Sequence, residues 1–544
     1  MSIAGDTHLS YPELSLYGAL AAAAQKAPSY TALDFQNRKT SFKNLLKEAD
    51  AAAAALTASG CRAGDTVTVC MPNLPQALVF FYAISRIGGT ANMVHPESAR
   101  NEIAFCLRLN HSRLILVLDR FYEVVREAAA LLDYPVEIVI AKVEDALPAV
   151  LVPAYALTEG RRTADIPGSG PGILWKNFLK RGKKVTLGEP QPFGRDHTGV
   201  ILYSGGISGK PKGIALSDYS FNACCVQAAA AIAKPFEPGM SMLSCMPCFH
   251  GFGLCMNLHA ALMFGVTCIL MPTFHIKTYA KLLTEKKPNY IAGVPTIFEA
   301  LIGLDLGNLR LDFLQGVFCG GDTLPIRLKR EVDAFLQAHG ATVQIREGYG
   351  LTESVTASCL TPTDEYREGS IGLPFPDIDY AIVRPGTAEL LPAGETGEIV
   401  MTGPTLMQGY LGEPEETADC MKLFPDGRVW LYTGDCGCMD ADGFVYFKGR
   451  RKRMLITNGF NVYPAQLEKI LCQSPLVKEA YVYGVPDPRR QQRIQAAVVL
   501  REGIPGDSET KNAILEYLKT ELARFEMPRM LEFVSQLPAE AERP

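Results

Sequence analysis

Along most of the chain, short apolar runs alternate with longer stretches in which apolar positions repeat at helical spacing. The runs DTVTVCMP, RLILVLD, VEIVIA and GVILYSG predict buried strands. The stretches SFKNLLKEADAAAAALTASG and PQALVFFYAISRIGG predict helices that end at glycine. Because strands and helices alternate, we expect parallel sheets covered by helices, which is an α/β fold.

The pattern changes after about Tyr380. YAIVRP, GEIVMTG and GFVYFKGR predict short strands separated by Gly and Pro turns, and therefore a smaller β-rich subdomain. From about Arg453, a helix near PAQLEKILCQ, strands at EAYVYGV and IQAAVVL, and a helix at ETKNAILEYLKTELARF predict a small α+β domain. A length of 544 residues also favours several domains over one core.

The longest apolar stretch, Leu258 to Pro272, contains a histidine and is shorter than the roughly 20 residues of a membrane-spanning helix. It predicts a buried helix that turns at Gly265 into a buried strand. The N-terminus has no basic start before an apolar run, so we expect no secretory signal. These features predict a cytoplasmic protein without a transmembrane segment.

Composition narrows the function classes further. Charged residues make up 20% of the chain and the formal net charge is -5, which argues against a broad surface for nucleic acid. Fifteen cysteines in a chain without a signal fit free thiols in a reducing compartment. Cys245 and Cys248 form a CxxC followed by His250, but no second ligand pair at zinc spacing accompanies them. We expect most cysteines to act as small buried hydrophobes.

One loop, YSGGISGKPKG from Tyr203 to Gly213, is rich in glycine, hydroxyls and lysine. It follows an apolar strand, and ligands of α/β sheets bind at the carboxyl ends of strands. Its backbone amides, hydroxyls and ammonium groups would suit a phosphate chain. It is not a Walker loop, because Pro211 follows Gly209-Lys210, and the dinucleotide fingerprint GxGxxG is absent from the chain.

The loop resembles the phosphate loop of the AMP-forming acyl-CoA synthetases, members of the adenylate-forming ligase superfamily. Further stretches match that family in order and spacing: PCFHGFG, GVPTIFEAL, CGGDTLP, GYGLTES, GEIVMTGPTLMQGYLGEPEET, LYTGD and GRRKRMLITNGFNVYPAQLE. The resemblance covers nearly the whole chain. It implies a ligase in which a carboxylate attacks the α-phosphate of MgATP, and a thiol then displaces AMP from the acyl adenylate.

The resemblance also implies roles for single residues. Glu353 would hold Mg²⁺ and Thr352 would bind the phosphates, whereas Asp435 and Arg450 would bind the ribose. The complete set implied for nucleotide binding is Ser204, Gly205, Gly206, Ser208, Gly209, Lys212, Gly321, Asp322, Thr323, Tyr349, Gly350, Asp435 and Arg450. Tyr349 would present a flat face to adenine.

His250 bears on the choice of acid. Amino-acid-activating relatives generally carry an aspartate in this motif, and a buried ammonium group without a carboxylate is costly. With His250 among Phe249, Phe252, Leu254 and Met256, we expect a fatty or aryl acid. A packed core histidine is the alternative interpretation of His250, which we otherwise count with Thr352 and Glu353 among the catalytic residues.

The family's C-terminal domain rotates between the two steps about a hinge, which here would be Lys452. The resemblance then implies an N-terminal domain at 1–449, with its β-rich subdomain at about 380–449, a hinge at 450–452 and a lid domain at 453–544. The rotated lid would present NGFNVYP to the thiol of CoA, with Gly459 permitting close approach of the thiol arm.

Two stretches depart from the family pattern. Gly205 and Ile207 stand where hydroxyl residues are common in the phosphate loop. The final motif, roughly Leu-Pro-x-Thr-x-x-Gly-Lys, appears as LPAEAERP, so the catalytic lysine position holds Pro544. Either the end is shortened or altered, or the protein adenylates poorly; Arg543 is a poor substitute, because a rigid fork replaces a point charge imperfectly.

The sequence therefore predicts ATP-dependent joining of an apolar carboxylic acid to CoA, with ATP/AMP and Mg²⁺ as cofactors and no nucleic acid partner. Two alternatives remain open. One is acyl transfer to the phosphopantetheine of a carrier protein. The other is an adenylation-impaired member that binds nucleotide or acyl-CoA as a sensor or partner protein without completing adenylation.

Overall fold

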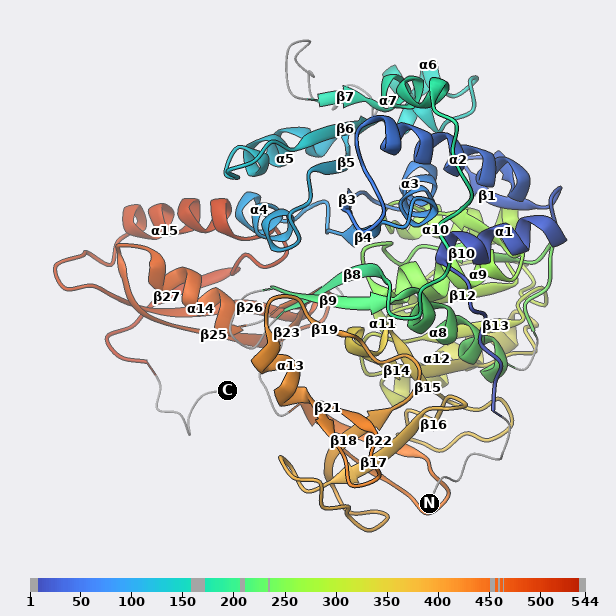
Figure 1. Ribbon diagram of the computed structural model, residues 1–544. Coiled ribbons are helices and arrows are strands. Elements are labelled where there is room, and N and C mark those ends of the chain that lie inside the picture. The colour runs from blue at the N-terminus through green and yellow to red at the C-terminus, as the bar shows by residue number, and fades with distance from the viewer. Residues whose placement is uncertain are drawn as a thin grey trace.

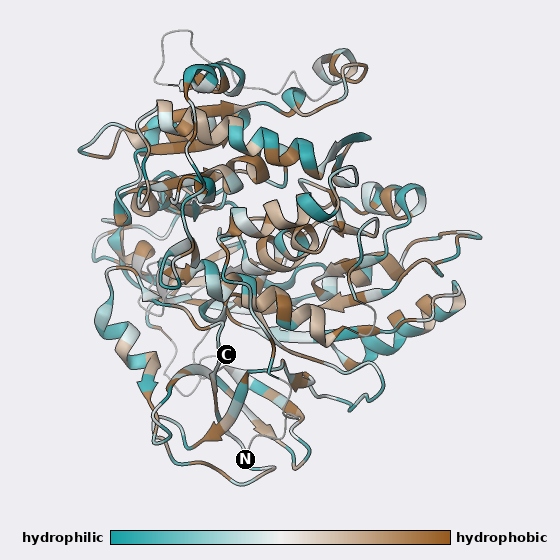
Figure 2. Cartoon of the chain, turned by 45° about the vertical axis from the view of Figure 1, so that its right-hand side comes forward, coloured by the Kyte–Doolittle hydropathy of each residue, from teal (hydrophilic) through white to brown (hydrophobic). Residues whose placement is uncertain are grey.

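The structure is a computed structural model of the 544-residue chain. It describes residues 8–157, 172–205, 211–232, 235–450, 455–457, 460–462 and 464–537. Four β-sheets organise these residues (Figure 1). Apolar residues concentrate on the inner strands and on the helix faces that cover them (Figure 2). The expected α/β class with a small β-rich part is confirmed.

An eight-stranded sheet occupies the N-terminal region, as far as the described residues define it. In spatial order its strands are β19 (Gly409–Tyr410), β9 (Pro211–Ser217), β8 (Thr198–Gly205), β4 (Thr90–Met93), β3 (Thr66–Cys70), β5 (Leu114–Leu118), β6 (Glu137–Ala141) and β7 (Gly172–Leu174). The pairs from β8 to β7 are parallel, whereas β9 is antiparallel to both β8 and β19. The four strands expected from apolar runs are β3, β5, β6 and β8.

A second large sheet has nine strands in the described chain. Their spatial order is β16 (Leu373–Pro374), β15 (Ala357–Leu360), β14 (Ile345–Gly350), β13 (Gly316–Cys319), β12 (Tyr290–Gly293), β10 (Ser241–Ser244), β11 (Thr267–Leu270), β1 (Thr31–Phe35) and β2 (Arg38–Ser41). The run from β14 to β1 is parallel, and antiparallel strands close both edges. The sheets are thus mixed, although parallel pairs form their centres.

Helices flank and connect these two sheets. The α-helices are α1 (Leu16–Lys26), α2 (Phe42–Ala58), α3 (Pro75–Arg86), α4 (Arg100–Leu109), α5 (Tyr122–Ala129), α6 (Val152–Leu157), α7 (Trp175–Arg181), α8 (Asp218–Ala231), α9 (Ala261–Met263), α10 (Ile276–Lys286), α11 (Pro295–Ile302) and α12 (Ile326–Ala338). The other helical segments are η1 (Asp119–Phe121), η2 (Val143–Asp145), η4 (Gly182–Lys184), η5 (Phe252–Ala260) and η6 (Thr352–Ser354).

Local chemistry explains where the two helices expected from the sequence begin. The Ser41 hydroxyl accepts the Asn44 N–H at 3.2 Å and caps α2. Pro75 is the first residue of α3, where its missing N–H leaves no helical bond unmade. Almost all of α3 is buried because it packs against α1 and α2 as well as the sheet, so its residues from Ala77 to Ile84 are hydrophobic on every side.

The stretch Leu258–Pro272 folds as expected, with one addition. The chain turns at Gly265, which has φ +81°, and continues into the buried strand β11. The preceding segment η5 is a π-helix. The spacing of apolar residues predicts a helix there but does not distinguish a π-helix from an α-helix. Such π-helical segments are frequent near functional sites, and η5 begins at Phe252, within the PCFHGFG motif.

A smaller sheet follows at the bottom of Figure 1. Its strands are β17 (Asp379–Val383), β18 (Gly397–Thr402), β21 (Val429–Met439), β20 (Met421–Leu423) and β22 (Val445–Arg450), and α13 (Pro414–Cys420) precedes β20. All its pairs are antiparallel, as Gly- and Pro-rich short connections favour.

The C-terminal unit, residues 455–537, has its own sheet and core. Its elements are β23 (Leu455–Thr457), β24 (Phe460–Val462), α14 (Pro464–Gln473), β25 (Val477–Asp487), β26 (Gln491–Leu500), α15 (Ser508–Glu521) and β27 (Met530–Phe533). Asp507 caps α15 by accepting the Thr510 N–H at 2.9 Å. The unit lies beside the N-terminal sheet, with α15 against α4 (Figure 1).

Aromatic and polar contacts join the C-terminal unit to the rest of the chain. Phe460 and Phe525 stack with ring centroids 4.3 Å apart, and both rings contact His95 at 5.4 and 5.2 Å. Asn101 on α4 donates to the Glu521 carboxylate at the end of α15. We call the contact of α4 and His95 with the segment 521–526 and Phe460 the docking interface.

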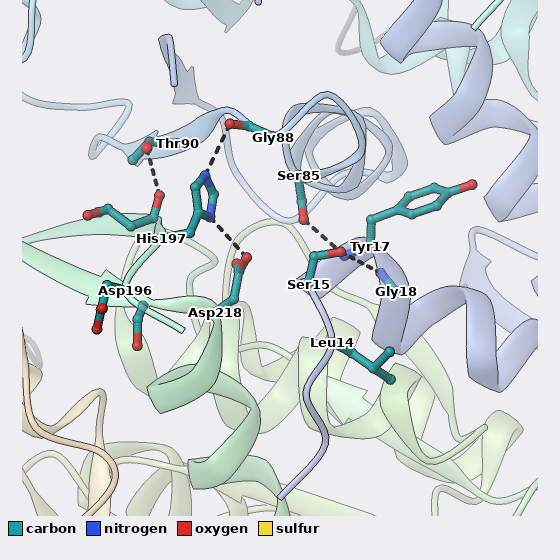
Figure 3. A network of polar contacts seen from close by, with 12 residues as sticks. Leu14, Ser15, Tyr17, Gly18, Ser85, Gly88, Thr90, Asp196, His197 and Asp218 are labelled. Atoms are coloured by element: carbon teal, nitrogen blue, oxygen red, sulfur yellow. Dashed lines mark hydrogen bonds and ion pairs between the residues drawn. The ribbon is translucent and has the colours of Figure 1, made fainter. Parts of the chain in front are cut away.

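A partly buried His–Asp pair ties the start of α8 to the N-terminal sheet (Figure 3). His197 Nδ1 lies 3.0 Å from Asp218 Oδ2, and His197 Nε2 lies 3.1 Å from the Gly88 carbonyl oxygen. Both partners are acceptors, so the imidazole meets them fully only when it carries two protons. The Asp218 bond raises the pKa of His197, and burial raises the pKa of Asp218.

Candidate active site

A large cavity lies where the two large sheets and the smaller β-sheet meet. Its volume is about 1040 Å³. The residues lining it that the sequence had already pointed to are Ser204, Lys212, His250, Gly321, Tyr349, Gly350, Thr352, Glu353 and Asp435. Motifs separated by up to half the chain therefore converge on one space.

Tyr349 and Asp435 form the side of the cavity next to the smaller sheet. Tyr349, on β14, donates its hydroxyl to Asp435 Oδ2 at 2.7 Å. Asp435, on β21, is only 1% exposed, and its backbone pairs with that of Arg450 on β22. The GYGLTES and LYTGD motifs are thus joined by a charge-assisted hydrogen bond.

Glu353 lies in the short helix η6 after β14. Its Oε1 accepts the Tyr410 hydroxyl at 2.9 Å and the Ser204 hydroxyl at 3.5 Å. Its backbone carbonyl accepts the Met407 N–H at 2.8 Å. The carboxylate is therefore oriented by β8 on one side and by the 407–410 segment on the other, with Thr352 beside it in the cavity wall.

A strained turn follows Glu353. Val355 has φ +68° and ψ -60°, and the Thr356 N–H donates to the Ser354 carbonyl at 2.9 Å across it. This is the rare γ-turn, which is unfavourable for a β-branched residue and typical of functional sites. The turn brings the Val355 carbonyl against Gly251, where an added Cβ would lie 2.1 Å from that oxygen. Glycine at 251 thus lets the motif of His250 pack on the motif of Glu353.

Lys212, at the exit of the phosphate loop, is held on two sides. Its ammonium forms an ion pair with Glu416 and lies 4.4 Å from the centroid of the Tyr410 ring. The residue is 8% exposed, so both contacts are shielded from water and stronger than on a surface. The cation is kept beside the cavity and not released into solvent.

The CGGDTLP motif contributes Gly321 to the cavity wall, in a left-handed conformation with φ +79°. Asp322 and Thr323 follow it but do not belong to the lining in the part of the chain that is described. Asp322 instead accepts a bond from Gln491 of the C-terminal unit. Nearby, burial raises the pKa of Glu347 to about 7, although its Oε1 accepts the Leu324 N–H at 2.9 Å.

His250 lines the cavity together with Gly251 and Phe252. Protein surrounds the ring, yet the side chain keeps an exposed surface, which faces the cavity. Burial lowers the pKa of His250 to about 4, so the imidazole is neutral at physiological pH. Behind it, the ring of His95 lies 6.5 Å away, and burial lowers the pKa of His95 to about 3.

A large further part of the cavity wall is apolar. It is formed by side chains from α8, β10, η5, β12 and β13 and from the segments that follow α8, β10 and β12: Ala228, Ile232, Phe236, Met242, Met246, Met256, Ala260, Ala292, Val294 and Phe318. Phe252 and Met256 belong to it as expected from the PCFHGFG motif. Leu254 is instead buried in the core, and Phe249 packs on His95 with ring centroids 4.2 Å apart. Leu254 faces the core from within η5, whereas Phe249 precedes η5 and lies beside His250 as well as His95.

Several predicted site residues lie outside the described residues: Gly206, Ser208, Gly209, Lys452 and Gly459. So do Ile207 and residues 538–544, which hold the second departure from the family pattern. For Gly205 and Arg450 the structure describes the backbone, at the ends of β8 and β22.

Two features of other protein classes are missing within the described ranges. No group of three or more His, Cys, Asp and Glu side chains there could enclose a metal ion, so Cys245, Cys248 and His250 form no such cluster. No helix there is long and apolar enough to cross a membrane.

Comparison with known proteins agrees with this arrangement. The AMP-binding enzyme family model matches residues 20–411, and the model of the AMP-binding enzyme C-terminal domain matches residues 466–543. A long-chain-fatty-acid–CoA ligase of Bacillus subtilis is 31% identical over 541 residues, which are 98% of this chain and 93% of that protein.

Solved structures show the same fold. The o-succinylbenzoate CoA synthetase of Bacillus subtilis, bound to a product analogue, superposes with a TM-score of 0.78 at 22% identity and covers 97% of both chains. An anthranilate CoA ligase in complex with anthranoyl-AMP gives 0.69 at 23% identity, covering 100% of this chain and 97% of that one.

The fold and the cavity together define an adenylate-forming ligase. The chain belongs to the AMP-binding enzyme family, and the resemblance of its sequence to the AMP-forming acyl-CoA synthetases is confirmed.

Sequence reasoning missed Tyr410 and Glu416. Both lie in the stretch GEIVMTGPTLMQGYLGEPEET, which we matched to the family without assigning a role to any of its residues. The sequence offered only a tyrosine that follows a glycine and precedes an acidic run. That pattern by itself is more typical of a turn than of a binding site. Their contacts with Glu353 and Lys212 depend on strand pairing between β19 and β9.

Proposed function

We propose that the protein activates an apolar carboxylic acid, fatty or aryl, with ATP to an acyl adenylate and transfers the acyl group to the thiol of CoA. The observation that carries this proposal is the composition of one cavity. Its lining combines Glu353, Lys212 and Asp435 with a large set of apolar side chains. A nucleotide and an acid of low polarity would therefore meet in it.

For the nucleotide, Asp435 would accept hydrogen bonds from the ribose hydroxyls, together with Arg450. Tyr349 would contact the adenine ring, beside the backbone of Gly321, Asp322 and Thr323. The phosphates would lie along the loop that begins at Ser204 and ends at Lys212, whose amides and ammonium offset their charge.

Mg²⁺ fits the donor set near Glu353. A carboxylate beside the Thr352 and Ser204 hydroxyls offers the hard oxygen ligands that this ion prefers. When bound there, the ion would neutralise charge on the phosphates. Glu353 would hold it and Thr352 would bind the phosphate oxygens, so the protein supplies position and charge, while the acid's own carboxylate attacks the α-phosphorus and pyrophosphate leaves.

The apolar wall and the neutral His250 support an acid without a charged tail. A carboxylate or ammonium on that tail would be buried without a counter-charge, which is unfavourable. The Bacillus subtilis relative named a long-chain-fatty-acid–CoA ligase supports a fatty acid. We retain both fatty and aryl acids as candidates.

In the second step the CoA sulfur would attack the adenylate carbonyl carbon, and AMP would leave. The C-terminal unit would turn about Lys452 and bring Gly459 to the thiol arm. Phe460, one residue further along, already contacts His95 behind His250, which favours entry of the thiol from this side. We propose the boundaries 1–449, 450–452 and 453–544 for the moving parts.

The test is pyrophosphate release from ATP that depends on added acid, measured over a panel of fatty and aryl acids. Activity with some acids and loss of it in Glu353→Gln are expected. The variant Arg543→Gly/Pro544→Lys, which restores the family's final Gly-Lys, is expected to release pyrophosphate faster, while thiolation from a supplied acyl adenylate changes little. If neither wild type nor this double variant releases pyrophosphate with any acid, the result would favour the alternative of an adenylation-impaired protein that binds nucleotide or acyl-CoA as a sensor.

The same assay separates the acceptors. CoA alone is expected to complete the reaction with a supplied acyl adenylate. Acyl transfer that occurs only when a carrier protein is present would instead establish the carrier protein as the acceptor. A cytoplasmic location remains a prediction of the sequence.

A further inference from the structure

Tyr410 lies between two groups that the proposed reaction needs. Strand β19 pairs antiparallel with β9, and Tyr410 stands opposite Ile214. Lys212 lies on the same strand β9, at the exit of the phosphate loop. Helix η6 with Glu353 contacts both β8 and β9. Tyr410 thereby connects a carboxylate and an ammonium group that come from separate motifs.

The two contacts use different parts of the side chain. The hydroxyl donates to Glu353 Oε1 at 2.9 Å, and the ring face lies 4.4 Å from Lys212 Nζ. Burial, together with the Glu353 charge, raises the pKa of Tyr410, so the hydroxyl keeps its proton and remains a donor. The backbone N–H of Tyr410 donates to the Thr417 hydroxyl at 2.9 Å, which fixes the residue against α13.

The carboxylate is held by two hydroxyls on the same oxygen. Ser204 reaches Glu353 Oε1 at 3.5 Å, the longer of the two bonds. Because both donors converge on one oxygen, they limit the positions that this oxygen can take. Glu416 performs the corresponding task for Lys212 through its ion pair.

We propose that Tyr410 is a positioning residue that sets the Glu353 carboxylate for a divalent cation and holds Lys212 for the phosphate chain. The inference rests on the proposed function and adds to it a residue that no motif assigns. Its two halves are separable: the hydroxyl acts on the cation through Glu353, and the ring acts on the phosphates through Lys212.

The separation dictates the experiment. Tyr410→Phe removes the hydroxyl and keeps the ring, whereas Tyr410→Leu removes both. Equilibrium binding of ATP is measured by competition with a fluorescent ATP analogue, once in EDTA and once as a function of Mg²⁺ concentration. This readout does not require turnover and therefore does not depend on the acid or the acceptor.

Tyr410→Phe is expected to bind ATP in EDTA as wild type does, but to need roughly ten-fold more Mg²⁺ for half of the metal-dependent gain in affinity, the scale of one charge-assisted hydrogen bond. Tyr410→Leu is expected to show the same Mg²⁺ shift and, in addition, weaker ATP binding in EDTA. Ser204→Ala is expected to give a smaller Mg²⁺ shift in the same direction.

Tyr446→Phe is the matched control, because Tyr446 also donates to a carboxylate, Asp440 at 3.1 Å, but outside the cavity lining. It is expected to bind as wild type. If ATP binding by both Tyr410→Phe and Ser204→Ala depends on Mg²⁺ as it does in wild type, the positioning role of Tyr410 is overturned and the proposed function is left untouched. Failure of wild type to bind ATP with or without Mg²⁺ would overturn the proposed function as well.

Discussion

The Tyr349 hydroxyl donates to Asp435 Oδ2 at 2.7 Å, across 86 residues of sequence. It joins the end of β14 in the nine-stranded sheet to β21 in the smaller sheet. A carboxylate that is 1% exposed needs such a donor, because an unpaired buried charge is strongly unfavourable. The contact therefore fixes the place where we expect the ribose.

Tyr349→Phe is expected to weaken ATP binding about ten-fold, which corresponds to roughly 1.4 kcal/mol for a hydrogen bond to a charged group. Asp435→Asn is expected to weaken it further, because the ribose loses a strong acceptor. Titration with a fluorescent ATP analogue measures both. If the double variant loses no less than the sum of the single losses, the two residues do not act as a pair.

The docking interface contains two neighbouring carboxyl groups, those of Glu102 on α4 and Glu526 after α15. Glu526 is 7% exposed. Burial, with the charge of Glu102, raises the pKa of Glu526 to about 8, and burial raises the pKa of Glu102. Burial raises the pKa of the Cys70 and Cys106 thiols, and the Glu102 charge raises both further.

The sign of the pH effect follows from these directions. When the C-terminal unit undocks, both carboxyls return to water and to ordinary pKa values near 4.5. Docking is therefore favoured while a carboxyl stays protonated, and it weakens as the pH rises toward and through about 8. We expect inter-unit fluorescence energy transfer to fall between about pH 4.5 and 8, the ordinary and the docked pKa of Glu526, and to level off above that range.

Glu526→Gln is expected to flatten that pH profile and to keep energy transfer high at alkaline pH, because the amide mimics the protonated carboxyl. Glu532→Gln, which changes an exposed carboxylate on β27 of the same unit, is the control and should keep the wild-type profile. A profile in Glu526→Gln that still falls with the wild-type midpoint would refute the assignment.

Stability should also depend on pH through His197 and Asp218 (Figure 3). Both pKa values are raised in the folded protein, so the pair holds its proton more tightly than the unfolded chain does. The stabilisation is present below the ordinary histidine pKa of about 6.5 and is lost as the pH rises through the folded value. Urea unfolding at several pH values above and below 6.5 measures it.

Asp218→Asn is expected to lower the free energy of unfolding by about 3 kcal/mol near pH 6 and to reduce the loss of stability with rising pH. His111→Gln, which changes a histidine near the protein surface, provides the comparison. If the free energy of unfolding of Asp218→Asn keeps the full pH dependence of wild type, groups other than His197 and Asp218 cause that dependence.

The acyl end of the cavity can be shortened from α8. Ala228 lines the cavity, whereas Ala230 on the same helix is exposed. Ala228→Phe is expected to raise KM for the longest accepted acids by roughly ten- to a hundred-fold, since each excluded CH₂ is worth about 0.8 kcal/mol. KM for ATP and for short acids should stay the same, and Ala230→Phe should change none of them. Equal losses for short and long acids would place the acyl chain elsewhere.

The sequence by itself determined the local structure and the chemical inventory of this protein. Strands β3, β5, β6 and β8 and helices α2 and α3 lie where periodicity and end signals predicted them, because such elements depend on neighbouring residues. The ordered motifs likewise identified the family, since each motif is contiguous in the chain.

Only the tertiary structure decided which side chains meet. The bond from Tyr410 to Glu353 spans 57 residues and depends on the pairing of a two-residue strand, which carries almost no pattern of its own. The π-helix η5 turned Leu254 into the core, and the docking of α15 on α4 brought Glu526 to Glu102. Such contacts depend on how whole elements pack, and the spacing of residues along the chain does not encode that packing directly.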